Sequence, residues 1–286
     1  MSSNSIVNNS LSNTAQRFLD VNNKRVGQSI ERVSSGIRVN RASDDIASLA
    51  VSDSLRSDVR ALRQGARNLN DGISLINVTE GALNEQGGAL IRLKELATQG
   101  SSGTIGQFER QTLQLEFSSL VAEIDRIAAT TEFNGRTLLD GSLANTIQAS
   151  EQGSVQIGID SASASRINLN VELNLSASNS TELGLSNLSV TSIEDARAAL
   201  EQIDISLTDL NSARGRAGAL QNRFAKSLGN LGVSIESLTA ADSSIRDADI
   251  AEELAQLTRN QIIVEASVSM IGQTNLSGQN LLSILG

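Results

Sequence analysis

The 286-residue sequence excludes several kinds of chemistry by composition alone. It contains no His, Cys, Pro, Trp or Tyr, so it lacks the commonest general base, thiolate nucleophiles, disulfides and the usual zinc ligands. A formal net charge of -9 repels phosphates, and the absence of Trp and Tyr removes most stacking platforms for bases. We therefore expect no enzymatic activity, no cofactor or metal, and no nucleic-acid partner.

The N-terminal segment predicts an amphipathic helix without a cleavable secretory signal. Residues 1–20 are rich in Ser and Asn and lack both a basic start and a continuous apolar run. Apolar residues then recur at roughly helical spacing, interrupted at Asn22. They are Leu11, Ala15, Phe18, Val26, Ile30, Val33 and Ile37. Ser43, Asp44 and Asp45 follow, and they indicate the start of a second helix better than a catalytic carboxylate pair.

Three central stretches carry apolar residues at alternating steps of three and four, which is the seam spacing of a coiled coil. They run over residues 55–97, 113–127 and 193–238. A capping box at residues 191–194 opens the last stretch, which would form a helix about 70 Å long. A helix of that length requires a long partner, and residues 55–97 supply it. The predicted seam of the last stretch includes Ala196, Leu200, Ile203, Leu207, Leu210, Ala217 and Phe224.

The segment between these helices predicts a small β-rich insert. Val155, Ile157 and Ile159 alternate with polar residues, and a second alternation runs over residues 167–175, which is typical of half-buried strands. Within the last long helix, the glycines of residues 214–218 lack phosphate-loop spacing and indicate a close approach of helices.

The C-terminal segment predicts another amphipathic helix. Asp247, Asp249, Glu252 and Glu253 lack EF-hand spacing and indicate a solvated helix face. The apolar stripe contains Ile250, Leu254, Leu257, Val264, Val268, Ile271, Leu282 and Leu285. Burying one Leu contributes about 1.5–3 kcal/mol, whereas ordering each residue costs about 1–2 kcal/mol. We predict that residues 1–40 and 243–286 order only when neighbouring copies bury their stripes.

Five segments of the sequence resemble the signatures of bacterial flagellins. Near the N-terminus these are residues 29–55, with Ser-Ser-Gly and Ala-Ser-Asp-Asp elements, and residues 68–85 and 123–141. Towards the C-terminus they are residues 218–224 and 244–263. The departures are Ile250, where an aromatic residue is frequent, and the final Gly286 in place of Arg. The resemblance covers nearly the whole chain except about residues 144–190.

The resemblance implies a mainly α fold of long antiparallel coiled-coil helices with a small β-rich insert, both termini being helical and paired. Residues 1–42 and 243–286 would form an inner terminal layer, residues 43–143 and 185–242 an outer helical domain, and residues 144–184 the insert. The chain would be secreted unfolded through the flagellar type III apparatus. It would then form a homopolymer, which is the extracellular filament. Its other partners would be an export chaperone, a filament cap and hook-filament junction proteins.

Flagellins are also sensed by a host Toll-like receptor. The resemblance places that recognition on Arg92, Glu95, Leu96 and Glu116, with Ile91, Leu93 and Lys94 replacing the common neighbours. Among the stripe residues named above, those that would form the subunit interface are Leu11, Phe18, Ile30, Val33 and Ile37 of the first terminal helix and all those of the second.

Two alternatives to a filament subunit remain. A hook-filament junction protein shares the terminal coiled coils, although the Asn-Asp-Gly-Ile element at residues 70–73 favours flagellin. An amphipathic membrane-binding protein would need flanking basic residues and Trp anchors. The chain has three Lys and no Trp, so we expect no membrane insertion.

Overall fold

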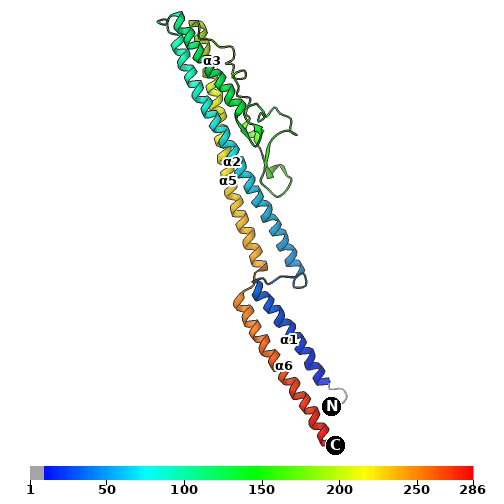
Figure 1. Ribbon diagram of the computed structural model, residues 1–286. Coiled ribbons are helices and arrows are strands. Elements are labelled where there is room, and N and C mark those ends of the chain that lie inside the picture. Colours follow the sequence, from blue (N-terminus) through cyan, green and yellow to red (C-terminus); the bar gives the residue numbers. More distant parts are fainter. Residues whose placement is uncertain (1–9, 286) are drawn as a thin grey trace. The chain divides into compact units, whose positions relative to one another are not determined.

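The protein is mainly α-helical in the computed structural model, which confirms the predicted fold class (Figure 1). The structure describes residues 10–285, with side chains for residue 10 and residues 12–276. Among these residues no helix is long and apolar enough to cross a bilayer. The helices are α1 (Ser10–Ser35), α2 (Ile46–Gly100), α3 (Gln107–Thr130), α4 (Leu169–Leu173), α5 (Ile193–Arg246) and α6 (Ile250–Leu285).

The chain divides into two compact units. The terminal unit comprises Met1–Ser57 and Ser237–Gly286, and the central unit comprises Asp58–Glu236. The long helices α2 and α5 contribute to both units, which the absence of Pro permits.

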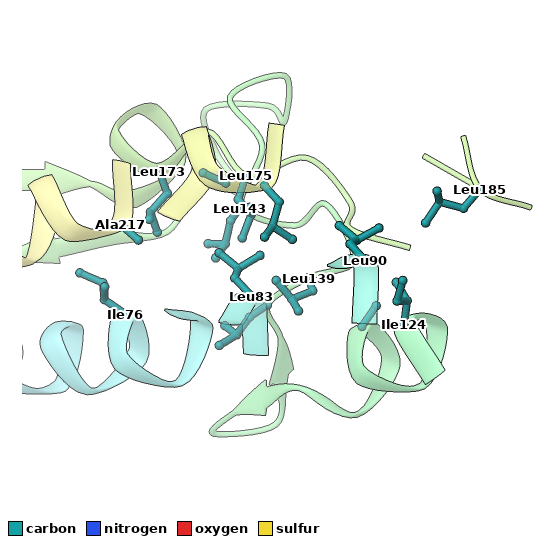
Figure 2. Packing of buried hydrophobic residues seen from close by; sticks show 14 of the residues in the cluster. Ile76, Leu83, Leu90, Ile124, Leu139, Leu143, Leu173, Leu175, Leu185 and Ala217 are labelled. Carbon is teal, nitrogen blue, oxygen red and sulfur yellow. The ribbon is translucent and has the colours of Figure 1, made fainter. Parts of the chain in front are cut away.

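The core of the central unit is formed by α2, α3, α5 and the insert. Within this unit α2 and α5 are antiparallel, because Gly72 lies against Phe224 whereas Lys94 pairs with Asp204. Figure 2 shows Leu83 of α2 beside Leu139 and Leu143, which lie between β2 (Arg136–Thr137) and the insert. The apolar residues at 0% exposure lie on all three helices and in the segments that flank the insert: Leu69, Ile76, Leu90, Leu93, Ala97, Ile124, Leu138, Leu139, Leu143, Val190, Ala196, Ala199, Ile203, Ala217 and Phe224.

The buried seam of α5 differs from the predicted seam at every second position. Ala196, Ile203, Leu210, Ala217 and Phe224 are buried as predicted. Leu200 and Leu207 are only half-buried, and the intervening buried positions are Ala199, Ser206, Ala213 and Leu220. Small side chains at three of these positions let α5 lie close to its neighbours. The gain from this close packing outweighs the gain from burying the larger apolar area of Leu200 and Leu207.

Two glycines of α2 allow its neighbours to approach closely. A methyl group at Gly65 would lie 2.5 Å from the carbonyl oxygen of Ile157 in the insert, and one at Gly72 would lie 2.6 Å from the buried ring of Phe224 on α5. Gly65 and Gly72 are seven residues apart, so they lie on one face of the helix. A larger residue at Gly65 would push the insert away from α2, and one at Gly72 would push away Phe224.

The insert contains less strand than predicted. Strand β3 (Ser154–Gln156) pairs antiparallel with β4 (Arg166–Asn168). The strand predicted from the first alternation is therefore present at Val155 but ends at Gln156, before Ile157 and the exposed Ile159. The strand predicted over residues 167–175 is wrong beyond Asn168, because that side chain accepts hydrogen bonds from the backbone N–H groups of Asn170 and Val171 and starts α4. A second hairpin joins β1 (Glu132–Phe133) to β2 (Arg136–Thr137) through Asn134 and Gly135, both with positive φ.

Two local predictions for α5 also require correction. Its N-cap is Ser192 instead of Thr191, because the Ser192 hydroxyl accepts the N–H of Asp195 at 3.0 Å. Gly215 and Gly218 do not mark a close approach of helices within the chain. A methyl group at either glycine would have nothing within 4 Å, so both face open space.

Candidate functional site

The terminal unit is built on the pairing of α1 with α6, as predicted for the two chain ends (Figure 1). Two polar links across the pair set its register. The Ser12 hydroxyl donates to Asn275 Oδ1 at 3.3 Å, and Arg32 Nη1 lies 3.1 Å from Glu253 Oε1. Links at both ends of α1 align the helices along their length.

The buried side chains of this helix pair are polar. Among the residues of α1 and α6 with described side chains, the buried ones are Ser12, Asn22, Ser29 and Glu253. Polar groups at a helix seam specify register but contribute little to stability. The pairing of α1 with α6 is therefore specific but weak.

The large apolar side chains of the same helices are left partly or mainly in solvent. Phe18 is 62% exposed and Val268 is 55% exposed. Of the predicted interface residues, Phe18, Ile30, Ile250, Leu254 and Val268 are exposed, Val33, Ile37, Leu257, Val264 and Ile271 are half-buried, and the side chains of Leu11, Leu282 and Leu285 lie outside the described residues. Such a concentration of exposed apolar area marks an interaction surface. We call the surface formed by the exposed side chains of Phe18, Ile30, Ile250, Leu254 and Val268 the terminal apolar face.

An open groove of about 430 Å³ interrupts this face between α1 and α6. Carbon-rich side chains form most of its walls. The lining residues are Ala15, Phe18, Asn22, Ile263, Ala266, Ser267 and Met270. The groove has the size and chemistry to accept an apolar side chain from another molecule.

Carboxylates cap the helices that begin in the terminal unit. Asp45 accepts the N–H groups of Ala47 and Ser48 at the start of α2, as predicted. Hydrogen bonds from the hydroxyl and the N–H of Ser48 lower the pKa of Asp45 below its ordinary value. At the start of α6, Asp249 accepts the N–H groups of Ala251 and Glu252 in the same way.

The prediction of a solvated acidic face is wrong for Glu253. Its side chain is buried against α1 and paired with Arg32, which the local sequence pattern did not indicate. Within the described residues no group of three or more acidic side chains is placed to hold a metal ion.

The residues matched to receptor recognition lie in the central unit. Arg92 pairs with Glu95 on its own helix and with Glu116 on α3, each at 2.8 Å. Hydrogen bonds from the Arg92 guanidinium, first to Glu95 and then to Glu116, raise its pKa above the ordinary value. Leu96 is 1% exposed and packs in the core beneath these side chains. The exposed part of the patch is therefore Arg92, Glu95 and Glu116.

Sequence reasoning missed the polar residues that make the helix pair specific. Ser12 and Ser29 lie off the predicted stripe and look like solvent-facing residues, so no sequence signal marks them. Asn22 interrupts the stripe, and a polar residue on an otherwise apolar stripe is the available signal there. Sequence reasoning also missed Gln86, which lies off the predicted seam and whose buried amide donates to the carbonyl oxygens of Ile124 and Ser178.

The fold and this surface together define a class of mainly α protein that pairs its two chain ends and keeps an apolar face for association. Comparison with known proteins identifies the family. The model of the bacterial flagellin N-terminal helical region matches residues 6–144, and that of the C-terminal helical region matches residues 200–285. The chain belongs to the bacterial flagellin family.

Relatives match along almost the whole chain. The chain is 37% identical to a flagellar filament 30.7 kDa core protein of Treponema maltophilum, covering 98% of this chain and 99% of that protein. It is 38% identical to a flagellin of Halalkalibacterium halodurans with the same coverage. A putative flagellar hook-associated protein of Vibrio parahaemolyticus shares the fold, with 15% identity, a TM-score of 0.56, and coverage of 71% of this chain and all of that one.

Proposed function

We propose that this protein is the structural subunit of a bacterial flagellar filament, polymerising with further copies of itself through the terminal apolar face. The observation that carries the proposal is the inverted packing of α1 and α6, in which buried positions are polar while Phe18 and Val268 face solvent. Association with other copies removes this apolar area from water. The family membership supports the same function, and a hook-filament junction protein is not favoured because the full-length relatives are filament proteins.

Several finer expectations belong to the same proposal. Residues 1–42 and 243–286 form the inner layer of the filament, residues 43–143 and 185–242 the outer domain, and residues 144–184 its insert. The subunit reaches the cell exterior unfolded through the flagellar export apparatus, with a chaperone, a cap and junction proteins as partners. Weak pairing of α1 with α6 supports this route, because helices that pair through polar groups separate easily before assembly.

Seeded polymerisation tests the proposal through a matched pair of variants. Leu254 is 46% exposed on the stripe, whereas Ala255 is exposed one position away from it. We expect Leu254→Gln to raise the monomer concentration needed for growth on short filament seeds, and Ala255→Gln to grow almost as the wild type does. Electron microscopy measures filament length. Equal growth of Leu254→Gln and wild type, or equal failure of both variants, would contradict the proposal.

A second proposed role is recognition of the Arg92, Glu95 and Glu116 patch by a host Toll-like receptor. The observation that favours it is an exposed ion-pair cluster next to Ile91, which is 55% exposed, so charged and apolar contacts are available together. Replacing Arg92 by Ala should reduce receptor activation by monomer, while Arg126→Ala, another exposed arginine paired with a glutamate, should leave it unchanged. Full activation by Arg92→Ala would refute this role.

A further inference from the structure

Methionine is the peroxide-sensitive residue type of this chain. The sequence lacks Cys, Trp, Tyr and His, so the two Met residues are its readily oxidised side chains. Met1 lies outside the described residues, whereas Met270 lies on α6. An oxidant acting on the folded terminal unit therefore has one principal target among the described residues.

The position of Met270 makes oxidation consequential. Its side chain is 63% exposed, which leaves the thioether accessible in the free chain. It also lines the groove between α1 and α6, beside the exposed ring of Phe18 and the side chain of Ile263. The polar side chains of the lining are those of Asn22 and Ser267, and the Ser267 hydroxyl already donates to the carbonyl oxygen of Ile263 at 2.7 Å. A sulfoxide formed at Met270 would therefore lie among mainly apolar side chains.

We infer that oxidation of Met270 by a hydroperoxide blocks polymerisation of the free subunit, and that polymerisation in turn shields Met270. The inference rests on the proposed function, because it takes a second copy of this chain as the molecule that covers the groove. A lone pair of the thioether sulfur attacks the OH oxygen of the hydroperoxide, and the O–O bond breaks. The proton of that OH moves to the departing oxygen, which leaves as an alcohol, or as water when the oxidant is hydrogen peroxide. The sulfur is oxidised to a sulfoxide and the peroxide is reduced.

The sulfoxide changes both the polarity and the shape of the groove wall. Its oxygen is a strong hydrogen-bond acceptor that loses water when a second copy covers the groove. We expect the critical monomer concentration for growth on seeds to rise about tenfold or more, the effect of burying one unpaired polar group. The unmodified thioether, by contrast, adapts to irregular apolar contacts.

The test treats wild-type and Met270→Leu monomers with dilute hydrogen peroxide, removes the oxidant and measures growth on untreated seeds. Leu conserves volume and cannot form a sulfoxide. Peptide mass spectrometry reports the oxygen added at Met270. At a monomer concentration just above the threshold of untreated wild type, treated wild type should fail to grow and treated Met270→Leu should grow. A methionine sulfoxide reductase should restore growth of the wild type.

A second arm exposes assembled filaments to the same peroxide and follows oxidation of Met270 with time. Slower oxidation in the filament than in the monomer is expected. Normal growth of fully oxidised wild type, failure of treated Met270→Leu, or equal oxidation rates in filament and monomer would overturn the inference. Failure of untreated wild type to polymerise would instead refute the proposed function.

Discussion

The central and terminal units use similar helices but bury opposite kinds of residue. In the central unit, α2 and α5 bury Ile76, Leu83 and Phe224 almost completely. In the terminal unit, α1 and α6 bury Ser12, Asn22 and Ser29, while Phe18 and Leu254 remain exposed. The difference shows that helical periodicity alone does not decide which face an amphipathic helix buries. The central unit satisfies its apolar seam within one chain, whereas the terminal unit leaves that task to neighbouring copies.

The same Leu→Ala substitution should have different effects on stability in the two units, and this is the largest difference that we expect. Leu83→Ala removes a side chain that is 1% exposed, and we expect the free energy of unfolding of the central unit to fall by about 2–5 kcal/mol. Leu254→Ala should change the unfolding of the central unit by less than about 0.5 kcal/mol, but should impair seeded growth. Denaturant unfolding followed by circular dichroism measures the first quantity. Similar unfolding curves for the two variants would break the comparison.

Glycine substitutions sharpen the account of the central unit. Gly65→Ala places a methyl group 2.5 Å from the carbonyl oxygen of Ile157, so we expect destabilisation by about 1–3 kcal/mol. Gly81→Ala on the same helix meets nothing within 4 Å and should stabilise by up to about 1 kcal/mol, because alanine favours helix. Thermal unfolding distinguishes them. An unchanged melting temperature for Gly65→Ala would show that the insert does not dock closely on α2.

The polar seam of the terminal unit can be converted into an apolar one. Asn22→Leu replaces a residue that is 7% exposed, and we expect the pairing of α1 with α6 to strengthen by about 1 kcal/mol. Asn23→Leu, at an exposed neighbouring position, is the matched control and should leave the pairing unchanged. Hydrogen exchange of α1 amides in the monomer reports the effect. Equal protection in both variants would argue against a seam limited by its polar residues.

The smallest expected effect concerns the acid sensitivity of a helix cap. Hydrogen bonds from Ser48 lower the pKa of Asp45 in the folded chain, so its cap stabilises above the unfolded pKa of about 4 and is lost as the pH falls through the lowered value. Amide exchange at Ala47 and Ser48 should therefore accelerate below that pH. Asp45→Asn, which cannot ionise, should show no such step. The same step in Asp45→Asn would assign the acid effect to another group.

The sequence predicted the helices well because their determinants are local. A chain without Pro, with apolar steps of three and four, leads to α2, α3 and α5 near the expected positions. The seam of α5 was less predictable, because Ala199, Ser206 and Ala213 are buried through close approach of neighbours instead of their own apolar area. The helix α4 depends on the side chain of Asn168, and two-residue periodicity does not detect such a cap.

The apolar stripes of the terminal helices were predicted from the sequence. The burial of polar residues between α1 and α6, with the large apolar side chains left exposed, was not. The stripe from Ile250 to Ile271 is visible in the sequence, whereas the burial of Glu253 against Arg32 depends on a contact between residues 221 positions apart. Local sequence patterns cannot predict a contact between residues so far apart in the chain. The structure therefore adds the reason for weak pairing, which is the polar seam.

Hydrogen exchange of the monomer and of the filament shows whether the terminal helices are stabilised mainly by assembly. We expect amides of residues 10–35 and 250–276 to exchange rapidly in the monomer and slowly in the filament, while those of residues 69–97 exchange slowly in both. Strong protection of the two terminal segments in the monomer, or rapid exchange of the same segments in the filament, would contradict this expectation.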